Sequence, residues 1–171
     1  MSRGGDGSID PAGFDAALLV GMNYIPTMPE DARLSQAVRA AAARAAYDAT
    51  LSGHVFAQLR KAAPDLPVHV MPNPLRRRAA GAEPAAATVP YAVRLEDFRR
   101  GLGAGPVHVA GQPPETIVDE LYTADVHGLG AVALDEGRGA RSKAETDLSH
   151  MNGDYGALFL RHWLPTIAPA A

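Results

Sequence analysis

Residues 105–134 read GPVHVAGQPPETIVDELYTADVHGLGAVAL, and this stretch decides the predicted fold. Pro106–Ala110 and Gly130–Leu134 are short runs rich in Val, Leu and Ala, which are typical of strands buried on both faces. Glu115–Val126 lies between them and is predicted to be a helix. A strand, a helix and a second strand in this order indicate a βαβ unit with parallel strands.

The same alternation extends toward both ends of the chain. Ala16–Val20 and Pro67–Met71 are two more apolar runs that predict strands, and Thr88–Val93 predicts a short one. Apolar and polar residues repeat with helical spacing in the remaining segments. Helices are therefore predicted over Glu30–Ala63 with a weak point at Ser52–Gly53, and over Leu95–Leu102, Ala144–Met151 and Tyr155–Ile167.

These elements predict an α/β fold, with a three-layer, doubly wound, mostly parallel sheet of Rossmann-like type. The sheet belongs to a single domain over residues 14–171, and residues 1–13 are predicted to be a flexible leader. Ligands of such sheets bind where the strands end, at the carboxyl edge.

Composition excludes several classes of protein. The 171 residues carry a net charge of −3, whereas a nucleic-acid-binding protein needs a basic face. The chain has no cysteine, which excludes disulfides, thiolate metal sites and cysteine nucleophiles. No apolar run approaches the roughly 20 residues that span a bilayer, and no signal peptide is seen. We therefore expect a cytoplasmic protein without a nucleic-acid or membrane partner.

Several segments resemble the isochorismatase-like, or cysteine hydrolase, superfamily. AALLVGMN at 16–23 is similar to its first strand, and LRKAAPDLPVHV at 59–70 looks like its helix and second strand. The most specific similarity covers 105–151, which contains the stretch quoted above. Together these segments cover about half of the chain. The resemblance implies an isochorismatase-like α/β domain.

The family's catalytic aspartate, lysine and cysteine are all missing. The aspartate position falls on Gly21 and the cysteine position on Ile117, neither of which can titrate. The lysine is expected between Pro74 and Val93, where the chain has none. The family's metal cluster after the second strand has no counterpart in VMPNPL, so neither a metal nor another cofactor is expected.

Other residues near the expected pocket could carry chemistry. Glu115 and Asp135 are the candidate acid–base groups, although Glu115 could equally cap a helix and Asp135 could be structural. His69 and His108 occupy strand centres and are predicted to be wall residues rather than metal ligands. The candidate ligand-binding residues follow or flank strands: Asn23, Tyr24, Tyr91, Arg94, Thr116 and Ile117.

Three functions remain open. The first is a pseudoenzyme that binds a small organic molecule or a protein partner, as a homodimer or with a paralogue. The second is a biosynthetic tailoring enzyme that has rebuilt the old pocket with acid–base residues, in which case the protein is catalytic. The third is a short relative of luciferase-type flavin monooxygenases, because 105–134 and the final FLRHWLPTI are also similar to the end of their barrel.

The sequence also predicts a backbone feature and a mode of self-association. The family bends the loop before its nucleophile with a cis peptide, and the matching position here is Gln112–Pro113. A cis bond there would turn the amides of Thr116 and Ile117 toward the pocket. The apolar stripe of Tyr155–Ile167 predicts self-association through that helix.

Overall fold

The computed structural model describes residues 10–20, 25, 34–81, 89–135, 139–142 and 147–167. The chain divides into two compact units. Unit 1 comprises Met1–Asn73 and Val93–Ala110, and unit 2 comprises Pro74–Ala92 and Gly111–Ala171.

A parallel sheet of three strands forms the centre of unit 1. Its strands are β1 (Ala17–Val20), β2 (Val68–Met71) and β3 (Val107–Val109), in the order β1-β2-β3. Leu18, His69 and His108 are aligned in register across the three strands. The predicted α/β class and these three strands are confirmed. The described strands follow chain order without a reversal, and the doubly wound three-layer arrangement stays a prediction.

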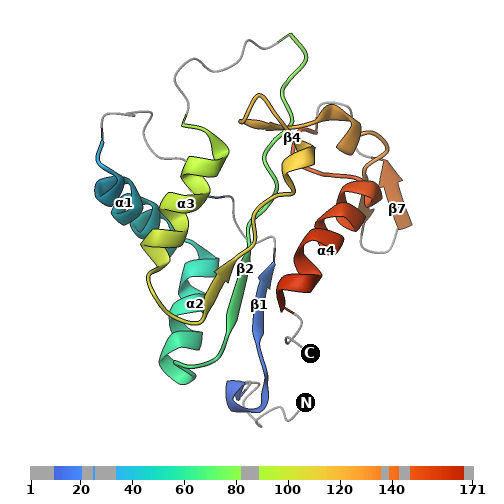
Figure 1. The fold of residues 1–171 in the computed structure, drawn as a ribbon. Helices are drawn as coiled ribbons and strands as arrows, with labels where there is room; N and C mark the ends of the chain where they lie inside the picture. Colours follow the sequence, from blue (N-terminus) through green and yellow to red (C-terminus); the bar gives the residue numbers. More distant parts are fainter. Residues whose placement is uncertain are drawn as a thin grey trace. The chain divides into compact units, whose positions relative to one another are not determined.

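Helices α1 (Gln36–Asp48), α2 (Leu51–Ala62) and α3 (Tyr91–Leu102) make the crossovers between these strands. Figure 1 shows the three helices gathered on one side of β1 and β2. One aromatic ring from each helix contributes to a cluster in which Tyr47 contacts both Phe56 and Phe98. The ring centroids of Tyr47 and Phe98 are 5.0 Å apart in a T-shaped arrangement. All three are buried, and they form the core between the helices.

The predicted helix over Glu30–Ala63 is two helices in its described part. The break lies at Ala49–Thr50, just before the predicted weak point, because Thr50 caps α2. Its hydroxyl oxygen accepts from the Gly53 N–H at 3.0 Å and its hydroxyl donates to the Tyr47 carbonyl at 2.6 Å. A side chain at Gly53 would collide with that carbonyl, so glycine permits the tight turn between α1 and α2.

The prediction that every strand is buried on both faces is wrong for β1 and for β3, the other edge strand of the described sheet, whose His108 is exposed. β2 is buried throughout, but Leu18 and Val20 are 46% and 56% exposed. The physical reason is position, because β1 is an edge strand of the described sheet and the helices of unit 1 lie on one side of it.

The predicted helix over Glu115–Val126 is wrong, and this segment belongs to unit 2. The chain forms a short 3-10 turn (Pro114–Thr116) and then a hairpin of β4 (Ile117–Val118) and β5 (Tyr122–Thr123). Asp119 and Glu120 turn the hairpin with φ of 51° and 57°, the pattern of a type I′ turn. The β-branched pair Ile117–Val118 favours this extended backbone over a helix.

Three further elements complete unit 2. β6 (Val132–Asp135) confirms the predicted strand, but it pairs antiparallel with β7 (Gly139–Ser142) rather than joining the parallel sheet. α4 (Gly153–Ile167) confirms the predicted final helix. The Asn152 side chain caps it by accepting from the Tyr155 N–H at 3.0 Å.

Two other predicted elements differ. The strand predicted over Thr88–Val93 is wrong where described, because Val89 and Pro90 are irregular and α3 begins at Tyr91. Of the predicted helix Ala144–Met151, the described residues from Asp147 onward are not helical. The remainder of both segments and residues 1–9 of the predicted leader lie outside the described residues. None of the described helices is both long and apolar enough to cross a membrane.

Candidate functional site

The site residues predicted beside the first strand lie outside the described part of the chain. These are Asn23 and Tyr24, together with Gly21 at the family's aspartate position. Asp135 is described and ends β6. Because β6 belongs to a two-stranded antiparallel hairpin, Asp135 does not end a strand of the parallel sheet as predicted.

The loop at 112–117, which is expected from the sequence to bind a substrate carbonyl, uses two of its own N–H groups for hydrogen bonds within the loop. All described peptide bonds are trans, so the predicted cis bond at Gln112–Pro113 is wrong. The Thr116 N–H donates to the Pro113 carbonyl at 3.0 Å, and the Ile117 N–H donates to the Pro114 carbonyl. The two amides thus complete the 3-10 turn, while the Glu115 side chain is exposed to solvent.

Two predicted ligand-binding residues, Tyr91 and Thr116, both form hydrogen bonds with Gln112. The Gln112 N–H donates to the Tyr91 hydroxyl at 2.7 Å. Its side-chain NH₂ donates to the hydroxyls of Thr116 at 3.0 Å and Thr123 at 2.9 Å, and its Oε1 accepts from the Leu75 N–H at 2.8 Å. All of Gln112's side-chain polar atoms therefore have protein partners.

The Gln112 cluster is also deeply buried. Gln112, Thr116 and Thr123 are 5%, 0% and 1% exposed. The hydroxyls of Thr116 and Thr123 donate in turn to the carbonyls of Pro113 and Leu75, each at 2.6 Å. A buried and satisfied network of this kind holds a loop in one conformation and offers little to a ligand.

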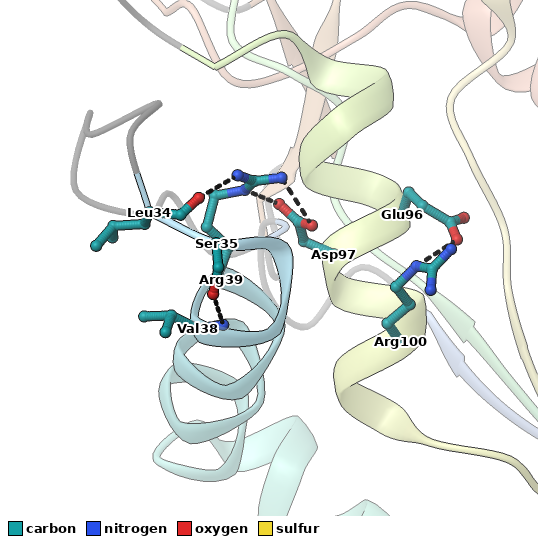
Figure 2. Close-up of polar contacts among 7 residues, drawn as sticks. All are labelled: Leu34, Ser35, Val38, Arg39, Glu96, Asp97 and Arg100. Atoms are coloured by element: carbon teal, nitrogen blue, oxygen red, sulfur yellow. Dashed lines mark hydrogen bonds and ion pairs between the residues drawn. The ribbon is translucent and has the colours of Figure 1, made fainter.

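A second polar contact joins α1 to α3 in unit 1. Arg39 Nε lies 2.7 Å from Asp97 Oδ2, and Arg39 Nη1 donates to the Leu34 carbonyl at 2.7 Å (Figure 2). Arg94, another predicted ligand residue, lies on α3 rather than on a strand and is 7% exposed.

An open groove lies between α1 and α3, and we call it the α1–α3 groove. Its volume is about 570 Å³, which is in the range of small-molecule sites, although it is open to solvent. The small side chains in its lining keep the groove open, and polar side chains of the two helices surround it. Its lining residues are Gln36, Ala37, Ala40, Glu96, Arg99, Arg100, Gly103 and Ala104.

The groove's cationic side chains are held by local contacts. Arg100 Nε lies 3.0 Å from Glu96 Oε1, one helical turn earlier (Figure 2). Arg99 Nη2 donates to the Val109 carbonyl at 3.0 Å. Both arginines are exposed, and each guanidinium has further N–H groups beyond these contacts.

Two histidines, buried His69 and exposed His108, stack on each other on the sheet of unit 1. The rings of His69 and His108 have centroids 4.9 Å apart and an interplanar angle of 21°. Burial lowers the pKa of His69, and His108 lowers it further. In the described part of the chain, no three His, Asp or Glu residues group as metal ligands.

One carboxylate–histidine pair lies in unit 2. His150 Nδ1 is 2.8 Å from Asp147 Oδ2, and the same carboxylate accepts from the N–H groups of Ser149 and His150. A pair of this kind can orient an imidazole for proton transfer. The Asp147 carboxylate also closes a local turn, and no nucleophile is seen in contact with His150 among the described residues.

Sequence reasoning missed Gln112 and the α1–α3 groove. Gln112 does not titrate and therefore gave no catalytic signal. The groove does have a signal, because Ala37 and Ala40 in one predicted helix and Gly101 in another are small residues. Small residues on two neighbouring helices permit a close approach.

Comparison with known proteins identifies no relative, since no protein-family model, curated protein or solved structure matches the chain.

Proposed function

We propose that the protein binds a small organic molecule without catalysing its conversion, on an isochorismatase-like, three-layer α/β scaffold that has lost the family's catalytic groups. This scaffold proposal rests on the resemblance of the segments at 16–23, 59–70 and 105–151 to that family. The described parallel sheet and its crossover helices are compatible with it.

One observation carries the proposal that the protein is not a cysteine hydrolase. In the loop where the family has its nucleophile, the Thr116 and Ile117 amides bond within the turn and Ile117 supplies no reactive group. Hydrolysis through an acyl-enzyme, as in cysteine hydrolases, needs donors aimed at the developing oxyanion and a nucleophile beside them. This loop offers neither, whereas the α1–α3 groove offers room for a ligand.

The alternative is a tailoring enzyme that works through Glu115 and Asp135. An acid–base residue works best in a site that excludes water and tunes its pKa. The exposed side chain of Glu115 favours the binding protein over this alternative. A flavin enzyme is the third candidate, and a yellow colour of the purified protein would favour it.

A ligand screen by thermal unfolding, run beside an amide-hydrolysis assay, tests the proposal. We expect compounds that raise the melting temperature and are recovered unchanged. A ligand at about 100 times its Kd adds about 2.7 kcal/mol to the free energy of unfolding. Turnover that Glu115→Gln abolishes would establish the alternative, and a screen without any stabilising compound would remove the binding function.

We also propose that the binding protein is a homodimer. Tyr155 and Trp163 of the predicted stripe are buried, but Leu160 and Leu164, one turn apart on α4, are 47% and 50% exposed. Sedimentation velocity over a range of concentrations tests this, with Leu160→Gln/Leu164→Gln expected to shift the protein to a monomer. A wild-type protein that stays at 17.9 kDa at high concentration would contradict it.

A further inference from the structure

The α1–α3 groove exists because two helices approach closely along one line and separate beside it. At the contact line, a Cβ on Gly101 would lie 2.5 Å from the Ala40 carbonyl oxygen, so only glycine permits this approach. Beside the line, the short side chains of Ala37 and Ala104 leave the space open. Gly103 ends the groove with φ of 82°, a backbone conformation that also requires glycine.

The charge of the groove is opposite to that of the protein. Its lining includes two cations, Arg99 and Arg100, and one anion, Glu96, whereas the whole chain carries a net charge of −3. Gln36 and Ala37 are the first residues of α1, where backbone N–H groups have no intrahelical acceptor. The groove is therefore a small electropositive region on an acidic protein.

The chemistry of the lining selects one kind of ligand. Arginine donates several N–H groups in one plane and suits a carboxylate or sulfonate. The alanine and glycine surface suits an apolar body rather than a sugar or a second charge. The volume of the open groove is that of a small-molecule site, whereas a nucleic acid would need several phosphate contacts along a basic face.

We propose that the α1–α3 groove binds a small organic anion, with its acidic group at Arg99 and Arg100 and its apolar body against Ala37 and Ala40. This inference rests on the proposed binding function and names its site and ligand class. Glu96 weakens the site for an anion, because its carboxylate occupies part of Arg100 and repels a second negative charge.

The test compares naphthoate with naphthamide, which has the same shape and no charge, by isothermal titration calorimetry. We expect naphthoate to bind more tightly than naphthamide. Arg100→Gln should weaken naphthoate binding about tenfold, the order expected for one charge-assisted hydrogen bond. Glu96→Gln should tighten it, because it removes the competing carboxylate, and a purely structural role of Glu96 would not produce that gain.

Shape is tested separately from charge. Ala37→Leu should fill the groove and weaken naphthoate and naphthamide alike. Ala45→Leu is the matched control, because Ala45 is exposed on the same helix and does not line the groove. Arg161→Gln on α4 is the control for net charge. Circular dichroism should show that each variant is folded.

The outcomes separate this inference from the proposed function. Naphthoate binding that responds to Arg100→Gln, Glu96→Gln and Ala37→Leu supports both. Binding of naphthoate, or of any ligand from the thermal screen, that none of these variants alters overturns the groove and leaves the binding function standing. A protein that binds naphthoate no better than naphthamide overturns the anion specificity, and a screen with no ligand at all removes both proposals.

Discussion

Arg39 and Asp97 form an ion pair with 2.7 Å between Nε and Oδ2, although they are 58 positions apart in the chain. The side chains are 14% and 2% exposed, so the pair joins α1 to α3 out of contact with most of the solvent. Removing one member of a buried pair leaves the other charge desolvated and unpaired, and this penalty exceeds the stability that the pair itself contributes.

Asp97→Ala is therefore predicted to lower the free energy of unfolding by about 3–5 kcal/mol. The double variant Asp97→Ala/Arg39→Met should lose less than the sum of the single variants, because it strands neither charge. Urea denaturation measures both. The control is Asp48→Ala, which breaks the exposed Arg44–Asp48 pair and should cost under about 1 kcal/mol. Additive losses in the double variant would contradict the argument.

Two helical glycines should respond to alanine with opposite signs. Gly101→Ala places a methyl group 2.5 Å from the Ala40 backbone oxygen, which forces α1 and α3 apart and should destabilise the protein by about 1–3 kcal/mol. Gly156 of α4 has open space around its Cβ position, so Gly156→Ala should stabilise by about 0.5–1 kcal/mol. Melting curves that move in the same direction would refute the predicted close approach.

The sequence predicts the parallel sheet well, because buried strands leave a strong local signal. Val68, Val70 and Val109 belong to short runs of β-branched residues between turn signals. The hairpin of β4 and β5 could not be predicted in the same way. Its turn uses Asp119 and Glu120 at positive φ, where glycine or asparagine would have marked it, and the segment instead has a helix-like apolar spacing.

The candidate site was harder to predict than the fold. A groove depends on how far apart two helices lie, and that distance follows from Gly101 against Ala40, residues 61 positions apart with no chemical signature. The predicted residues Tyr91 and Thr116 are linked, but through Gln112, whose backbone N–H and side-chain amide together have four partners that only the folded chain brings together.

Loss of the Gln112 side chain is predicted to destabilise unit 2 severely. Gln112→Leu removes the acceptor of the Leu75 N–H and a donor to each of two buried threonine hydroxyls. Each buried polar group left without a partner costs about 1–3 kcal/mol, so the variant should unfold at much lower urea concentration. Gln58→Leu on the exposed side of α2 is the matched control and should change little. A stable Gln112→Leu protein would show that water replaces the amide.

The stacked histidines predict how stability depends on pH. The folded protein holds the pKa of His69 below the ordinary 6.5, because burial and His108 both disfavour its charged form. Below pH 6.5 the unfolded chain therefore binds more protons than the folded one. The contribution of His69 to stability is complete above pH 6.5 and is lost as the pH falls toward its folded pKa. The slope is at most about 1.4 kcal/mol per pH unit for one proton.

His69→Leu should flatten the loss of stability between pH 7 and pH 5 in urea titrations, whereas His162→Gln, at an exposed position on α4, should leave that loss unchanged. Equal slopes for His69→Leu and the wild type would show that other groups govern the acid sensitivity.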